Sequence, residues 1–116
     1  MALTFDEICI DAHDAAALGA WWSKVLGWRH HVNGDGDVVL EAPPGAGTNL
    51  LFLDVPDDKV VKNRIHLDFP PDDQHAEVDR VIGLGARHVD IGQGEQSWVV
   101  LADPEGNEFC ILAAND

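Results

Sequence analysis

The sequence predicts an α+β fold of two βαβββ modules, the first over about residues 1–58 and the second over about residues 59–116. Two observations predict it: the order strand, helix, strand, strand, strand can be followed twice along the chain, and local marks recur at matching places. These marks are a polar residue seven positions before a helix-opening aspartate (Glu7 and Asp14, His66 and Asp73) and a Leu-Gly pair that closes each helix (26–27 and 84–85). With 116 residues, 46% of them hydrophobic, the chain can bury one core, so we expect a single domain over 1–116.

The first module opens with a strand over residues 3–11. Ile8 and Ile10 point one way, whereas Glu7 and Cys9 point the other, and this period of two is typical of a half-buried strand.

A helix is expected next, over residues 14–27. Asp14 suits the position before its first turn, and Gly27 suits its end. Its apolar residues recur at helical spacing and predict a buried stripe in which both tryptophans pack into the core: Leu18, Trp21, Trp22 and Val25.

Three further strands complete the first module. Residues 28–32 and 38–42 flank Asn33-Gly34-Asp35-Gly36, a cluster that tolerates positive φ angles and predicts a hairpin. After a loop over residues 43–47, an apolar run predicts a strand over residues 49–55.

The second module repeats this order. We expect a strand over 64–69, a helix over 73–84, and strands near 87–91, 98–102 and 108–112. The last two strands are joined by Asp103-Pro104-Glu105-Gly106-Asn107, whose residues favour a tight turn.

The composition excludes several classes of partner. A net charge of −14, from 21 acidic and 7 basic residues, repels nucleic acid and anionic lipid. No stretch approaches the roughly 20 uninterrupted apolar residues of a membrane helix, and the N-terminal segment lacks the positive charge of a signal peptide, so we expect no membrane partner and a cytoplasmic location. Cys9 and Cys110 are expected to be free thiols, and motifs of serine hydrolases, P-loops, dinucleotide sites and zinc ribbons are absent.

Three segments carry a resemblance to a known family: WWSKVLGW, KNRIHLDF and DPEGNEFCIL. They resemble the glyoxalase/bleomycin-resistance/dioxygenase (vicinal oxygen chelate) superfamily over nearly the whole chain, and the later two resemble a glyoxalase-like subgroup. The resemblance implies curved mixed sheets around a cleft that can bind a divalent metal, and it implies a homodimer. Fold transfers safely across such a superfamily, whereas the reaction does not.

Strand alternation predicts which side chains share a face. On the concave, cleft-facing side we expect His66, Asp68, Glu108 and Cys110 of the second module together with Glu7 and Cys9 of the first. On the side covered by helices we expect Ile65, Leu67, Phe69, Phe109 and Ile111.

The resemblance further implies metal ligands at Glu7, His66 and Cys110. A carboxylate, an imidazole and a thiolate suit zinc or another borderline transition ion, and an open position would polarise a substrate oxygen. Metal enzymes of the superfamily more often carry His or Gln at the first position and Glu at the last, and the fourth position falls on Leu53, which cannot bind metal. The alternative stays open that the cysteines are small hydrophobes in the cleft floor and that His66 is hydrogen-bonded locally.

Two functions follow, and both involve a small-molecule ligand. The first is a divalent-metal-assisted lyase, isomerase or oxygenase. The second is a metal-free binding or drug-sequestering protein whose acidic, tryptophan-bearing cleft holds a cationic or aromatic molecule. Candidate substrate-binding residues are Cys9, Asp68, Leu53, Trp98 and Glu108, with the Trp98 indole either stacking on a ligand or covering the sheet edge.

Overall fold

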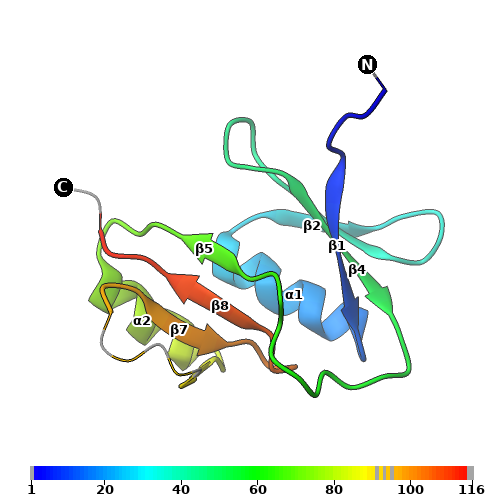
Figure 1. Cartoon of the computed structure of the whole chain (residues 1–116). Coiled ribbons are helices and arrows are strands. Elements are labelled where there is room, and N and C mark those ends of the chain that lie inside the picture. Colours follow the sequence, from blue (N-terminus) through cyan, green and yellow to red (C-terminus); the bar gives the residue numbers. More distant parts are fainter. Residues whose placement is uncertain (1, 91, 93, 95, 115–116) are drawn as a thin grey trace. The chain divides into compact units, whose positions relative to one another are not determined.

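The computed structural model describes residues 2–90, 92, 94 and 96–114. The chain divides into two compact units, Met1–Asp58 and Lys59–Asp116. Each unit holds one helix and one four-stranded mixed sheet. Figure 1 shows the course of the chain through these elements. The expected α+β class and the repeated βαβββ order are therefore confirmed.

The first unit forms a sheet with strand order β1-β4-β3-β2. β1 pairs with β4 in parallel, and the other two pairings are antiparallel. Helix α1 packs against β3 and β4 (Figure 1). The elements are β1 (Glu7–Ala12), α1 (Ala15–Leu26), β2 (Arg29–Val32), β3 (Val38–Glu41) and β4 (Asn49–Asp54).

Helix α1 begins and ends where the sequence predicts. The Asp14 carboxylate accepts a hydrogen bond from the backbone N–H of Ala17 at 3.0 Å, and Gly27 takes the left-handed conformation with φ of 70° that favours glycine. Its apolar stripe buries Trp22 fully and Trp21 partly, with the two rings in edge-to-face contact. The core of this unit contains Leu18, Trp22, Leu40 and Phe52.

The second unit repeats the arrangement with strand order β5-β8-β7-β6. β5 pairs with β8 in parallel, β8 with β7 and β7 with β6 antiparallel, and α2 contacts β8. The Asp73 carboxylate caps α2. The elements are β5 (Leu67–Phe69), α2 (Gln74–Gly83), β6 (Arg87–His88), β7 (Val99–Ala102) and β8 (Glu108–Ile111).

The core of the second unit includes Val81, Leu101 and Phe109. Phe69 and Phe109 pack edge to face with ring centroids 6.1 Å apart, so these two side chains share one side of the sheet as alternation predicts.

The turn between β7 and β8 is built around Asp103, whose side chain is buried. Its Oδ1 accepts hydrogen bonds from the backbone N–H groups of Glu105 and Asn107 at 2.9 and 3.0 Å, and Gly106 adopts a φ of 92°. The sequence prediction of a tight turn at this point is confirmed.

Several strands are shorter than expected, because pairing rather than composition decides where a strand begins. β1 starts at Glu7, opposite the first residue of β4, and not at residue 3. β5 covers only the residues that pair with β8, so Ile65 precedes the strand and is 79% exposed instead of lying under a helix. β6 ends at His88, and Ile91, the expected end of that strand, lies outside the described residues.

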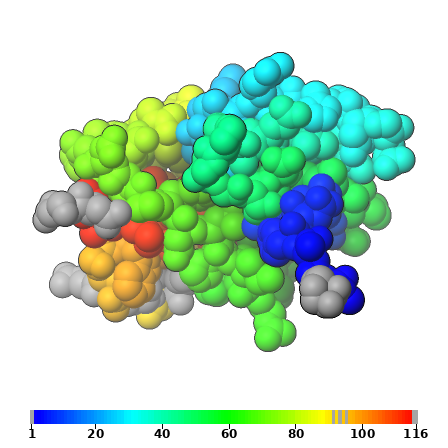
Figure 2. Space-filling view, turned by 90° about the horizontal axis from the view of Figure 1, so that it is seen from above, coloured from blue at the N-terminus to red at the C-terminus, as the bar shows by residue number. Residues whose placement is uncertain are grey.

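The surface of the first unit includes its N-terminal segment and one strand of its sheet (Figure 2). Residues 2–6, dark blue in Figure 2, and strand β2, cyan, are exposed to solvent. Neither helix of the described chain has the length and apolar character needed to span a bilayer.

Candidate metal site in the second unit

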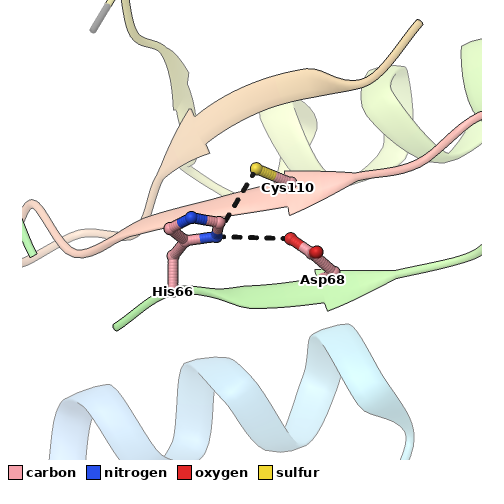
Figure 3. A group of neighbouring side chains, drawn as sticks. All are labelled: His66, Asp68 and Cys110. Atoms are coloured by element: carbon pink, nitrogen blue, oxygen red, sulfur yellow. Dashed lines mark hydrogen bonds and ion pairs between the residues drawn. The ribbon is translucent and has the colours of Figure 1, made fainter. Parts of the chain in front are cut away.

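Three side chains able to bind a metal lie together in the second unit: His66, Asp68 and Cys110 (Figure 3). His66 Nδ1 lies 3.3 Å from Asp68 Oδ1 and 3.9 Å from Cys110 Sγ. One potential ligand atom from each residue lies within 4.8 Å of the others. Cys110 is buried, whereas His66 and Asp68 are exposed, so the group can be reached from solvent.

The sheet itself brings two of these residues together. Asp68 on β5 and Cys110 on β8 are direct partners in the parallel ladder, so their side chains project from the same side of the sheet. His66 lies two residues before Asp68, and its ring reaches the same side just before β5 begins. The predicted meeting of an imidazole with the Cys110 thiol is therefore present in the second unit.

The hydrogen-bond pattern excludes a nucleophilic triad in this arrangement. Both contacts of the imidazole use Nδ1, whereas a triad requires the carboxylate on one ring nitrogen and the nucleophile on the other. Burial, together with the negative charge of Asp68 and a hydrogen bond to it, raises the pKa of the Cys110 thiol to about 11. At neutral pH the thiol is protonated and is a poor nucleophile.

The donor set fits a divalent metal of borderline softness. Imidazole nitrogen, carboxylate oxygen and thiolate sulfur are all zinc ligands, and three protein ligands leave the fourth position open, as in catalytic zinc sites. Ligand atoms of tetrahedral zinc lie roughly 3.3 to 3.8 Å apart, so donors within 4.8 Å of one another would need to approach by about 1.5 Å at most. Two anionic ligands and a neutral imidazole would balance the charge of a dication.

The candidate residues of the first unit lie on β1 and β4. Glu7 and Cys9 share one face of β1, and Cys9 Sγ donates to Glu7 Oε2 at 3.7 Å. Partial burial and the negative charge of Glu7 raise the pKa of the Cys9 thiol. Leu53 on β4 is half-buried beside Asp11 of β1. A role for Glu7 as a third ligand, and for Cys9 and Leu53 in substrate binding, stays a prediction.

Glu108 and Trp98 belong to the second unit but not to the metal-binding group. Glu108 is buried, and its carboxylate is hydrogen-bonded to Lys59 and to the backbone N–H of Asn63. It lines a hollow of about 400 Å³ with Lys59 and Arg87. Trp98 lies just before β7 and is partly exposed. Contact of either residue with substrate stays a prediction.

The predicted common face of His66 and Asp68 is present, and the Asp68 carboxylate lies beside His66 and Cys110; its contact with substrate stays a prediction. The sequence spacing predicts that these side chains lie close together, because His66 and Asp68 stand two residues apart and share a face in an extended chain. The register that sets Asp68 opposite Cys110 could not be obtained from the sequence, since parallel strands far apart in the chain carry no local mark of their alignment.

A model of the family described as "Glyoxalase-like domain" matches residues 7–112. The chain belongs to this family. The match includes both units and all three residues of the His66, Asp68 and Cys110 group. No curated protein matches the glyoxalase-like chain in sequence.

Solved structures of the vicinal oxygen chelate superfamily share the fold of this glyoxalase-like chain. A glyoxalase/bleomycin resistance protein/dioxygenase family enzyme from Burkholderia phytofirmans PsJN is 20% identical, with a TM-score of 0.70, and covers 91% of this chain and 94% of its own. TnmS3, an antibiotic binding protein from Streptomyces sp. CB03234, is 18% identical, with a TM-score of 0.68 and 99% of both chains covered. A FosX fosfomycin resistance protein from Listeria monocytogenes, complexed with Mn(II) and 1S,2S-dihydroxypropylphosphonic acid, is 16% identical, with a TM-score of 0.71 and 99% and 93% covered.

Proposed function

We propose that this glyoxalase-like protein binds a small molecule at a divalent metal held by His66, Asp68 and Cys110, and acts on it as a lyase, isomerase or oxygenase. The observation that carries the proposal is the convergence of three different metal donors within 4.8 Å of one another. The Mn(II) in the FosX structure is a property of that protein, and it supports the proposal by analogy of fold alone.

A metal in this position would polarise a substrate oxygen and stabilise the negative charge that develops on it. Asp68 and His66 are exposed, which leaves room for substrate on the open side of the group, while the buried Cys110 closes the other side. The contact between His66 Nδ1 and Asp68 Oδ1 holds the imidazole beside Asp68 and Cys110 in the metal-free protein. We further propose that the protein is a homodimer, which sedimentation analysis of the purified protein would test, and that it is cytoplasmic, which fractionation of the cells that produce it would test.

Metal content tests this proposal directly. Protein purified without an affinity tag and supplied with Zn²⁺ should hold one ion per chain, and His66→Ala, Asp68→Asn and Cys110→Ser should each weaken binding. His75→Ala is a matched control, because that imidazole lies exposed on α2. With Co²⁺ in place of Zn²⁺, a thiolate-to-metal absorption band should be present in the wild type and absent in Cys110→Ser. A protein without stoichiometric metal under these conditions would refute the proposal.

A second candidate is metal-free binding of a cationic or aromatic molecule. The observation in its favour is that the group satisfies its own hydrogen bonds, since Cys110 carries a proton at neutral pH and His66 is bonded to Asp68. Trp98, 38% exposed, could stack on a flat ligand. That TnmS3 is an antibiotic binding protein supports this candidate only through the shared fold.

Tryptophan fluorescence separates the two candidates. A metal-free binder should respond to cationic aromatic compounds by a change in emission and a higher Tm, both lost in Trp98→Ala and both unaffected by a chelator. Trp21→Phe is the control because Trp21 packs against Trp22 on α1 of the other unit. If no compound changes emission or Tm, this candidate is excluded.

A further inference from the structure

The segment that leads to His66 is attached to the sheet by a buried carboxylate. Glu108, the first residue of β8, is 8% exposed. Its Oε1 accepts a hydrogen bond from the backbone N–H of Asn63 at 2.6 Å, and its Oε2 accepts one from Lys59 Nζ. Asn63 also donates from its side-chain amide to Asn107 at 3.2 Å. We call Glu108, Lys59 and Asn63 the Glu108 clasp.

His66 needs such an attachment because the strand ladder does not hold it. Asp68 and Cys110 face each other within the β5–β8 pairing, but β5 begins only at Leu67. The preceding segment is also poor in apolar packing, with Val60 86% and Ile65 79% exposed. The clasp fixes this segment at Asn63, three residues before His66, and fixes it to the strand that carries Cys110.

We propose that the Glu108 clasp sets the position of His66 relative to Cys110, so that Glu108 and Lys59 are positioning residues for the metal site. The consequence for metal affinity rests on the proposed function. The position of the ring does not, and it can be measured in the metal-free protein. A buried ion pair adds little to stability compared with apolar packing, but its directional hydrogen bonds can specify one arrangement. The clasp joins the segment that leads to His66 to β8, the strand that carries Cys110.

The test uses the full-length chain with Glu108→Gln, Lys59→Met and the conservative Lys59→Arg. Two quantities are measured: the nuclear Overhauser contact between the His66 ring and the Cys110 β protons without metal, and the Kd for Zn²⁺. Glu108→Gln and Lys59→Met should weaken the contact and raise the Kd about 10- to 100-fold, as is usual for partners that orient metal ligands. Lys59→Arg, which keeps a donor and a positive charge, should preserve both.

Glu77→Gln is the matched control, because it removes a carboxylate paired with Arg80 on the exposed face of α2. It should leave both quantities unchanged. Lys59→Met keeps the test open if Glu108→Gln does not fold, since it leaves β8 intact. An unchanged contact and Kd in a folded clasp variant would overturn the inference. If the wild type binds no Zn²⁺, the proposed function fails, and the nuclear Overhauser contact alone decides whether the clasp positions His66.

Discussion

The affinity of the second unit for Zn²⁺ should rise about tenfold with each pH unit between about pH 7.5 and 9.5. In the proposed site the ion would bind the thiolate of Cys110, but burial, then the charge of Asp68 and a hydrogen bond to it, raise the pKa of that thiol to about 11. At about pH 7.5, roughly one molecule in 3000 therefore carries the thiolate before metal binds, which costs about 5 kcal/mol of binding free energy. Each pH unit removes about 1.4 kcal/mol of this cost.

Competition against a chelator of known pH dependence measures this effect. Cys110→Ser should bind more weakly and lose the slope, because no thiol proton remains to be displaced. Cys9→Ser, which changes the other cysteine and lies on β1, should retain the slope. A wild-type affinity that changes less than about twofold over the whole range would refute the reasoning, because the metal would then not be displacing a proton from Cys110.

Three further predictions concern stability. Gly19→Ala should lower the free energy of unfolding in urea by about 1–3 kcal/mol, because the new methyl would lie 2.6 Å from Val38 Cγ1. In the control Gly83→Ala the new methyl meets nothing within 4 Å, so the free energy of unfolding should rise by up to about 1 kcal/mol. Equal effects of the two substitutions would contradict the packing of α1. Asp103→Ala should lower the free energy of unfolding by about 2–3 kcal/mol, because it leaves backbone N–H groups of the turn without an acceptor. An unchanged Tm would contradict the role of Asp103 in the turn. Burial acts to raise the pKa of Glu108, but the hydrogen bonds from Lys59 and Asn63 outweigh it, and the pKa in the folded protein is lowered. The carboxylate therefore stabilises the fold fully above the unfolded pKa of about 4.3, and this stabilisation is lost as the pH falls through the folded pKa. Glu108→Gln should make Tm fall less steeply in this acidic range, and parallel curves of Tm against pH for the variant and the wild type would contradict the prediction.

Most of the fold could be predicted because its signals are local. The aspartate caps and Leu-Gly endings of both helices lie within the elements they define, as does the turn at Asp103. The strand limits could not be predicted in the same way. Ile65 continues the alternation of Leu67 and Phe69 in the sequence, yet it has no partner on β8 and is exposed. Alternation describes a face only where a neighbouring strand exists to define one.

The candidate site could be predicted only in part. The spacing of His66 and Asp68 shows their common face, and the resemblance to the superfamily brings in Cys110. The Glu108 clasp could not be predicted from the sequence, because Lys59 stands 49 positions before Glu108 in a polar connection that has no distinguishing motif. Long-range pairs of single charges cannot be distinguished in sequence from solvated residues, especially in a chain with 21 acidic side chains.

The proton on Cys110 is the physical point at which the two candidate functions divide. While the thiol is protonated, it can donate a hydrogen bond to Asp68, which is also in contact with His66. The three side chains then bind one another and suit the floor of a metal-free binding site. Once a cation displaces the proton, the same three side chains supply two negative charges and one neutral donor on one side of the sheet. The burial that raises the pKa of the Cys110 thiol would also shield an ion held in the proposed site from water on that side. The slope of Zn²⁺ affinity against pH therefore shows whether a metal displaces the proton of Cys110, and so distinguishes the two candidate functions.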